Sequence, residues 1–343
     1  MQKEYRDGMK KGITLLFSML FVQVLVGQII QANYRSPLSE LQAQGWQVHS
    51  HSLSYDEQTL VFSAKAPQQT HYDLYTARKN AKVWENITPL TTLNTAADEL
   101  YPTLSSSEQD LIFVKRSVEA GKGKKTVETF YLMSTNHAQS QWTAPDVIII
   151  SKGKDISPIL LADNKTVIFA SSRTTDNKKD GNFALFYTQR IDNRNWVNPI
   201  LILAPKNKNE HYYAPYVKNF VRQGNTRTIT IGYTHQICNN RDTSYVAEQM
   251  VLPEQFHPRF ILTLEGRIRD VKSKRFIPAQ LNVYHAINFK PLAQIKTSSV
   301  GTYKLGLPAG TPYFIDITSE NYSHHYCEYN CTELTTDTTI KVN

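Results

Sequence analysis

Short apolar runs separated by polar turns follow one another from about residue 48 to residue 257. Runs of this length are typical of strands, and no window of twelve or more residues shows the 3.6-residue period of an amphipathic helix. The longest helical candidate, Tyr245 to Phe256, is interrupted by Pro253. The pattern therefore predicts an all-β region.

One unit of this pattern is repeated along the chain. It contains a polar turn, a buried apolar strand, a loop, an aromatic-rich strand and a tryptophan, so that Trp84, Trp142 and Trp196 recur at intervals of a little over fifty residues. A period of this length is typical of repeat architectures. A fourth copy begins at Glu210 and has no terminal tryptophan, as is common for the last repeat of an array.

A β-propeller explains why such a unit recurs. A four-stranded antiparallel sheet of about fifty residues has two apolar faces, and packing similar sheets around an axis covers each face with a neighbour. Pro102 and Pro158 lie eleven residues before the buried phenylalanines of their copies, where a proline can begin an innermost strand. We expect the tryptophans to fill the wedges between blades. Four blades are readable, and the segment from Asn33 to Gln47 could add a closing strand or a fifth blade.

The repeat also resembles a known one. Its pattern of E-x-x-P, a polar turn, a (V/I)-F strand, a (L/I)-Y step and W resembles the PD40 or TolB-type WD40-like propeller repeat over residues 48–257. The usual Asp-Gly of the first turn is replaced here by Asp56-Glu57, Ser107-Glu108 and Asp163-Asn164. The resemblance implies a propeller whose loops are presented from a stiff frame.

The composition changes at His257-Pro258, beyond which strand patterns alternate with Gly, Pro and Ser turns. The motifs from Gly301 to Tyr303 and from Leu307 to Tyr313 resemble the carboxypeptidase regulatory-like domain, a seven-stranded, transthyretin-like β-sandwich. Residues 338–342 would form its closing strand. We therefore predict an all-β chain with three parts: a signal peptide over residues 1–32, a propeller over 33–257 and a sandwich over 258–343.

The leader has the pattern of an export signal. A basic segment ends at Lys11, and an apolar run of about fifteen residues follows from Ile13 to Gly27, which is shorter than the roughly twenty residues that a membrane span needs. An uncleaved anchor is the alternative. No cysteine directly follows the run, so a lipid anchor is not expected. The pattern predicts export to the periplasm or to the periphery of the outer membrane.

The net charge of +8 does not indicate a nucleic-acid partner. The leader alone contributes four lysines and arginines, and the remaining charges are dispersed without an aromatic-basic platform. The sequence contains no motif for a nucleophile elbow, a zinc protease, a P-loop, a dinucleotide site or an EF-hand. We therefore expect no catalytic centre, no cofactor and no metal.

Three acidic residues lie near the starts of the innermost strands: Glu99, Asp155 and Glu210. In one interpretation they ring the mouth of the central channel and contact a cation or a basic peptide segment. In the other they accept hydrogen bonds from loop N–H groups and hold the entry of each blade. If the chain were an enzyme, Glu99, Asp155 and His211 would be its acid/base candidates.

A cluster near the end of the chain, from His324 to Cys327 together with Cys331, contains donors that zinc accepts. Its spacing does not suit a closed zinc site, because adjacent histidines on one strand point to opposite faces and the cysteines are not arranged as C-x2-C. One alternative is a Cys327–Cys331 disulfide, which would close a tight loop in an oxidising compartment. The other is that these thiols are unpaired.

A propeller followed by this sandwich resembles exported envelope proteins of the gliding and type IX secretion type, in which a peptidoglycan-binding OmpA-like domain usually follows. The sequence stops before such a domain, so we do not expect peptidoglycan binding, whereas peripheral association with the outer membrane fits the pattern. The resemblance implies a non-catalytic scaffold whose propeller binds a protein partner in the cell envelope. The alternatives are a propeller-type hydrolase or lyase, or a glycan- or peptide-binding module, acting at the channel mouth. We expect function where the blades differ, above all in the loops Ser117 to Glu128 and Thr174 to Asn182.

Overall fold

The computed structural model describes residues 38–80, 83–120, 126–138, 141–148, 153–173, 181–192, 195–223, 226–238 and 242–342. The predicted signal peptide over residues 1–32 therefore lies outside the described residues. The chain divides into two compact units, residues 1–48 and 49–343. In the part of the chain that the structure describes, no helix has the length and apolarity that crossing a bilayer requires.

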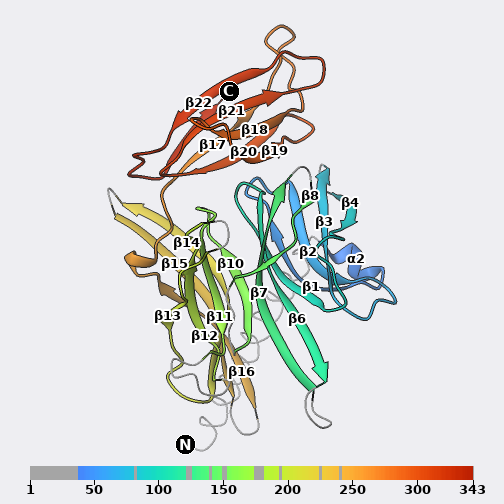
Figure 1. Cartoon of the computed structure of the whole chain (residues 1–343), viewed down its shortest axis with the longest axis vertical. Helices are drawn as coiled ribbons and strands as arrows, with labels where there is room; N and C mark the ends of the chain where they lie inside the picture. The colour runs from blue at the N-terminus through green and yellow to red at the C-terminus, as the bar shows by residue number, and fades with distance from the viewer. Residues whose placement is uncertain are drawn as a thin grey trace, which may run out of the picture. The chain divides into compact units, whose positions relative to one another are not determined.

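Four antiparallel sheets follow one another in the order of the chain (Figure 1). In each sheet the strands are hydrogen-bonded in the order in which they occur in the sequence, which is the arrangement of a propeller blade. The all-β prediction and the propeller prediction are confirmed. The described residues form four such sheets, made of β1 (Gln47–Leu53), β2 (Thr59–Lys65), β3 (Asp73–Asn80) and β4 (Val83–Pro89); β5 (Asp98–Leu104), β6 (Asp110–Ala120), β7 (Thr126–Ala138) and β8 (Gln141–Trp142), with β9 (Asp146–Val147) also pairing with β7; β10 (Asp155–Leu160), β11 (Thr166–Ser171), β12 (Ala184–Gln189) and β13 (Ile200–Leu203); and β14 (Glu210–Gln223), β15 (Thr226–Cys238) and β16 (Thr243–Val251).

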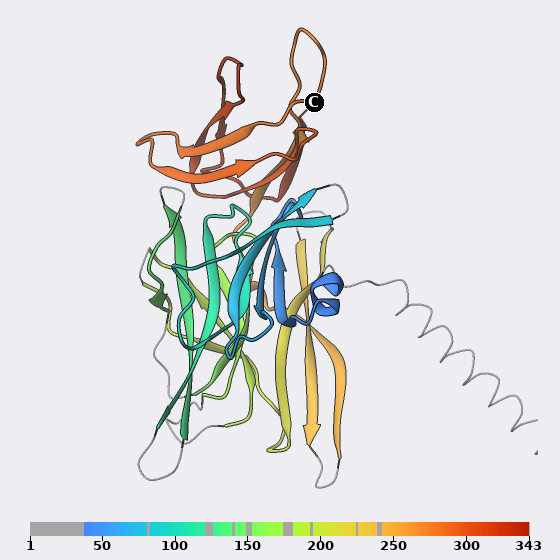
Figure 2. The ribbon, with the colours of Figure 1, turned by 90° about the vertical axis from the view of Figure 1, so that its right-hand side faces the viewer.

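The fourth sheet differs from the others in having three long strands, which Figure 2 shows in yellow and orange. Ahead of the first sheet, the helix α2 (Ser39–Ala43) occupies the segment for which a closing strand had been one interpretation, and Gln47 already belongs to β1. The described residues 38–46 therefore contain no strand. After the fourth sheet a short 3-10 helix, η1 (Glu254–Phe256), leads to the sandwich.

The core of the propeller lies between neighbouring sheets. The phenylalanines that occupy the same place in three copies, Phe62, Phe113 and Phe169, are fully buried at 0% exposure. Burying each contributes about 1.5–3 kcal/mol. Trp142 packs against the cluster between the first and second sheets, and Trp196 packs against the cluster between the second and third. These two tryptophans are wedges between blades, as predicted.

The first turn of three blades has the same unusual backbone. Glu57, Glu108 and Asn164 have φ values of 58°, 57° and 57°, and each N–H donates to the carbonyl three residues earlier at 3.0 Å. These are the positions at which the resembled repeat usually has glycine. Because a side chain in this left-handed conformation costs about 1–2 kcal/mol, each turn carries strain that a glycine would relieve.

Replacing Glu57 with glycine is therefore expected to raise the free energy of unfolding by about 0.5–1 kcal/mol, measured by chemical denaturation. Asn164→Gly is the matched control, because the Asn164 side chain makes hydrogen bonds that glycine cannot. Its Oδ1 accepts from the Ser106 N–H at 2.9 Å and from the Ser106 hydroxyl at 2.8 Å. Losing these bonds should make Asn164→Gly destabilising. A loss of stability in Glu57→Gly would contradict the argument from backbone strain.

Residues 261–342 form two sheets packed face to face. One sheet has the order β20-β17-β23 and the other β19-β18-β21-β22, and β23 runs parallel to β17, closing the first sheet as predicted. Their core contains Leu264, Leu281, Val283, Leu305 and Ile315. The strands are β17 (Ile261–Arg267), β18 (Gln280–His285), β19 (Pro291–Lys296), β20 (Thr302–Pro308), β21 (Pro312–Thr318), β22 (His325–Asn330) and β23 (Thr338–Val342).

The motif glycine of this sandwich has a steric role. Gly301 has a φ of +72°, and a Cβ at this position would lie 2.6 Å from the carbonyl oxygen of Ile277 and 2.7 Å from that of Ile268. Any other residue would therefore combine an unfavourable backbone conformation with a backbone clash.

Candidate functional site

The innermost strands of the second, third and fourth sheets contain the same irregularity. The strand register shifts between Leu100 and Thr103, between Ile156 and Ile159, and between Tyr213 and Tyr216. At each shift the residue before the proline has a positive φ: 51° for Tyr101, 50° for Ser157 and 50° for Ala214. A bulge of this kind redirects a side chain, and strained backbone is often found at functional sites. The shared bulge makes the region around Tyr101 the place to look for a site.

The predicted acidic residues lie near these bulges but are buried. Glu99 is 0% exposed, Asp155 is 1% exposed and Glu210 is 8% exposed. Glu99 and Asp155 occupy equivalent places in their strands. In the fourth sheet that place, three residues before the proline, belongs to Tyr212, and Glu210 lies two residues earlier.

Their hydrogen bonds are those of the loop-holding interpretation. Glu99 accepts from the Thr95 N–H at 3.1 Å and from its Oγ1 at 2.6 Å. Glu210 accepts in the same way from the Lys206 N–H at 3.0 Å. Asp155 instead accepts from the Ser171 hydroxyl at 2.6 Å and forms an ion pair with Arg173 at 2.7 Å. Burial and these internal donors fit the loop-holding interpretation of the three carboxylates.

A chain of ion pairs lies next to Glu99 and links the second and third sheets. Arg116 Nη1 lies 3.1 Å from the Asp98 carboxylate, and Arg116 Nη2 lies 2.7 Å from Glu128 Oε1. Lys154, which directly precedes β10, bonds the other oxygen of Glu128 at 3.0 Å. The hydrogen bonds from Arg116 and then Lys154 lower the pKa of Glu128, so this carboxylate is ionised at neutral pH.

Aromatic rings lie against these cations. The guanidinium of Arg116 is 5.8 Å and the ammonium of Lys154 is 5.2 Å from the centre of the Phe130 ring. Lys65 lies 4.4 Å above the ring of Tyr72, whose backbone N–H donates to Asp98 at 2.9 Å. Cation–π contacts of this kind contribute about 0.5–2 kcal/mol each. We call this set the Arg116 cluster: Lys65, Tyr72, Asp98, Arg116, Glu128, Phe130 and Lys154.

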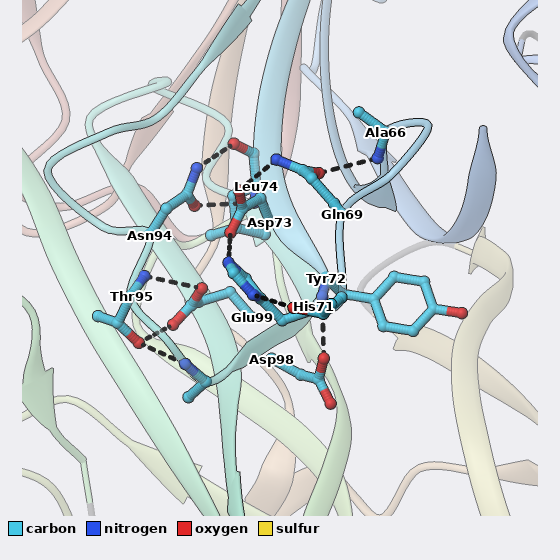
Figure 3. A network of polar contacts seen from close by, with 12 residues as sticks. Ala66, Gln69, His71, Tyr72, Asp73, Leu74, Asn94, Thr95, Asp98 and Glu99 are labelled. Carbon is cyan, nitrogen blue, oxygen red and sulfur yellow. Dashed lines mark hydrogen bonds and ion pairs between the residues drawn. The ribbon is translucent and has the colours of Figure 1, made fainter.

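The loop that carries Tyr72 and the start of β5, where Asp98 lies, are held by a network of polar contacts (Figure 3). Asn94 brackets Leu74 by accepting its N–H at 2.8 Å and donating to its carbonyl at 3.0 Å. Gln69 donates to Asp73 at 3.1 Å, and the Glu99 N–H donates to the Tyr72 carbonyl at 2.8 Å. The backbone that positions Tyr72 and Asp98 in the Arg116 cluster is thus held by hydrogen bonds.

Two further aromatic residues connect the Arg116 cluster with the bulge. The His49 ring meets the Tyr72 ring edge-on at 5.3 Å and the Tyr101 ring at 4.6 Å. Burial raises the pKa of Tyr101, and the nearby Ser157 of the next sheet opposes that rise. The first three sheets therefore meet at this point through polar and aromatic side chains.

The sequence did not single out the Arg116 cluster as a whole. One signal pointed to it, because Glu128 ends the predicted loop from Ser117 to Glu128. In the structure residues 117–120 belong to β6 and residues 126–128 to β7, and residues 121–125 lie outside the described residues. Of the second such loop, Thr174 to Asn182, residues 174–180 lie outside the described residues. The acid/base candidate His211 is on β14 in the fourth sheet, where its Nδ1 accepts from the Phe183 N–H at 3.2 Å.

The sandwich cysteines are free thiols, so the disulfide alternative is corrected. Cys327 lies within β22 and Cys331 directly follows that strand in the sandwich core. Four residues of extended chain span about 13 Å, whereas the Cα atoms of a disulfide lie within about 7 Å. Burial raises the pKa of both thiols. Among the described residues no group of three or more His, Cys, Asp and Glu side chains could hold a metal ion, and His324 is paired with Asp316 at 3.0 Å.

Comparison with protein-family models finds no match, and comparison with curated proteins finds none either. Among solved structures, a protein described as TolB from Agrobacterium tumefaciens is similar at 12% identity and a TM-score of 0.34, with 59% of this chain and 65% of that chain covered. This chain thus spans slightly less than two thirds of that one.

Two sugar-cleaving enzymes are also similar in structure. An α-L-arabinanase of Penicillium chrysogenum matches at 11% identity and a TM-score of 0.35, with 84% of this chain and 94% of that chain covered. The GH93 α-L-arabinofuranosidase of Fusarium graminearum matches at 11% identity and a TM-score of 0.39, with 90% and 85% covered. Scores this low carry no inference about function.

Proposed function

We propose that this chain is a non-catalytic scaffold of the cell envelope, whose propeller binds a segment of a partner protein at the Arg116 cluster. The leader pattern supports export. The resemblance of the repeats to PD40 or TolB-type propellers, and of the C-terminal sandwich to the carboxypeptidase regulatory-like domain, supports a place in an envelope assembly of the secretion or gliding type. The sandwich would then act as a rigid adaptor, and the propeller as the binding part.

The observation that carries the proposal is the exposure of the charged side chains in the Arg116 cluster. The side chains of Arg116, Glu128 and Lys154 are 33%, 34% and 35% exposed, so a partner can reach all three. Ion pairs this exposed contribute only about 0–1 kcal/mol, and exchanging Glu128 for a carboxylate of a partner costs little. Arginine and aromatic residues are also those that dominate the energetics of protein interfaces.

The environment of the carboxylates that were suggested as acid/base groups favours a binding function over a catalytic one. Glu99 and Asp155 are engaged by internal donors and nearly fully buried, so a substrate would have to displace those bonds to use them. The accessible carboxylate, Glu128, has a lowered pKa and is held by two cations, which makes it a poor proton acceptor at neutral pH.

The proposal predicts a crosslink that depends on the Arg116 cluster. A photo-reactive phenylalanine analogue in place of Tyr72, in the full chain in intact envelopes, should crosslink to one specific protein that mass spectrometry can identify. Adding Arg116→Ala should lower the crosslinking yield by about thirtyfold, because truncating an interface hot spot costs about 2 kcal/mol or more.

The matched control places the same analogue at Tyr245, which is 63% exposed on β16 and outside the Arg116 cluster. It should not capture that protein. The proposal is wrong if Tyr72 and Tyr245 capture the same set of proteins, or if the yield at Tyr72 is unchanged by Arg116→Ala.

A further inference from the structure

The outward face of one sandwich sheet carries aromatic residues where polar ones are expected. Along β18, β21 and β22 the side chains alternate, with Leu281, Val283 and Ile315 buried in the core. The opposite face carries Tyr284 and Phe314, which are directly paired across the two strands. An antiparallel sheet usually presents polar side chains on its solvent face. The aromatic residues here are therefore not explained by the packing of the sandwich.

On this face three rings contact a fourth, that of Phe314. Phe314 is at the centre, 6.2 Å from Tyr284, 5.5 Å from Phe289 and 5.5 Å from Tyr326, where distances join ring centres. Phe289 is 60% exposed and Tyr326 is 57% exposed. We call these four residues the aromatic face. A contiguous exposed apolar patch on a folded domain marks a binding site more often than chance packing.

Amide side chains lie beside the rings on the same face. Asn282 Oδ1 accepts from Gln280 Nε2 at 2.8 Å and from Gln294 Nε2 at 3.0 Å, and Asn282 is directly paired with Asp316. An amide can donate two hydrogen bonds and accept others, so each has capacity beyond these contacts. The ring cluster is thus bordered by groups that can both donate to and accept from a hydroxyl.

The charges of this face indicate a neutral ligand. Its charged groups are few and of both signs: Asp316 lies 3.0 Å from His324, Glu328 is directly paired with Phe314 and Lys296 with Gln280, and the amides carry no charge. A polyanion would need a cluster of arginines and lysines, and an acidic membrane surface would need the same. A sugar ring instead has an apolar C–H face, which packs on an aromatic ring, and a rim of hydroxyls, which pair with amides and carboxylates.

We propose that the aromatic face, with Gln280, Asn282, Gln294 and Asp316 at its border, binds a neutral glycan chain. Several adjoining rings, rather than one, give contact to more than one sugar unit of a chain. This inference goes beyond the proposed function, because it concerns the sandwich and not the propeller. Each can fail without the other, since the crosslink at Tyr72 and sugar binding at Tyr326 are separate measurements.

The test uses the full chain and two families of uncharged β-linked oligosaccharides, cellohexaose and chitohexaose, in isothermal titration calorimetry. We expect saturable binding of at least one of these oligosaccharides. Preference for cellohexaose would indicate a glycan without N-acetyl groups, and preference for chitohexaose an N-acetylated glycan. Tyr326→Ala should weaken binding about tenfold, because one lost ring contact is worth roughly 1.4 kcal/mol. The double variant Phe289→Ala/Tyr326→Ala should abolish it.

Both residues of the double variant are exposed, so the fold should be retained, and the unfolding midpoint checks this. Tyr245→Ala, an equally exposed tyrosine of the propeller, is the matched control and should bind as the unchanged chain does. The inference is overturned if neither oligosaccharide binds, or if Tyr326→Ala binds as well as the control. It is also overturned if the face captures apolar peptides but no sugar, since it would then be a protein interface.

Discussion

Replacing Asp155 with alanine is expected to destabilise the chain by about 3–5 kcal/mol. The Asp155 side chain is 1% exposed and its partner Arg173 is 15% exposed. The Arg173 guanidinium also lies over Phe169 and Phe186, at 5.2 and 5.4 Å from the ring centres. Without the carboxylate, this cation would remain against an apolar cluster, with no other counter-charge among the residues that the structure describes. Burial raises the pKa of Asp155, and the positive charge of Arg173 opposes that rise. Each charge of the pair therefore offsets part of the cost of burying the other.

Chemical denaturation of Asp155→Ala and of Glu128→Ala measures this effect. Glu128 is also paired with cations, but at 34% exposure its ion pairs should contribute no more than about 1 kcal/mol. The double variant Asp155→Ala/Arg173→Met should recover part of the loss, because it removes the unpaired cation. Equal losses in Asp155→Ala and Glu128→Ala would show that burial does not govern the strength of the Asp155 pair.

The second large effect is a dependence of stability on pH that comes from Glu108. Burial raises the pKa of Glu108 to about 7, the nearby charge of Asp56 adds to the rise, and Arg78 and a hydrogen bond from Thr59 oppose it. The folded chain then holds a proton that the unfolded chain releases near pH 4.5, so stability falls as the pH rises between these values. The loss is about 3 kcal/mol in total, and it is complete above pH 7.

Unfolding by denaturant at pH 5 and at pH 8 tests this. The unchanged chain should be less stable at pH 8, and Glu108→Gln should remove most of the difference. Glu57→Gln is the matched control, since Glu57 occupies the same place in the turn of the first blade and should leave the difference intact. If the unchanged chain has the same stability at both pH values, the environment assigned to Glu108 is wrong.

The repeated turns were predictable because their information is local. Hydrophobic alternation and the spacing of Trp142 and Trp196 indicate strands and blades without reference to distant residues. The unusual φ of Glu57 and Glu108 could also be anticipated, since both replace a glycine of the resembled repeat. Burial of Glu99 was not evident, because an acidic residue at a strand start fits an exposed or a buried place equally well.

The Arg116 cluster could not be predicted, because its members come from different strands. Pairing of β6 with β7 places Arg116 beside Phe130 and Val118 beside Glu128. Lys154 joins them from the third sheet. Which charges meet depends on strand register and on packing between sheets, and a shift of one residue would turn every side chain to the opposite face.

By itself, the sequence determined that this chain is all-β, built of repeated propeller blades and a terminal sandwich, because strand periodicity and turn residues act over short distances. Only the tertiary structure decided which acidic residues are buried, that Cys327 and Cys331 are apart, and that Tyr284, Phe314 and Tyr326 form one face. The physical reason is that burial and contact depend on the register between strands that are distant in sequence. The alternation of side chains within one strand does not fix that register.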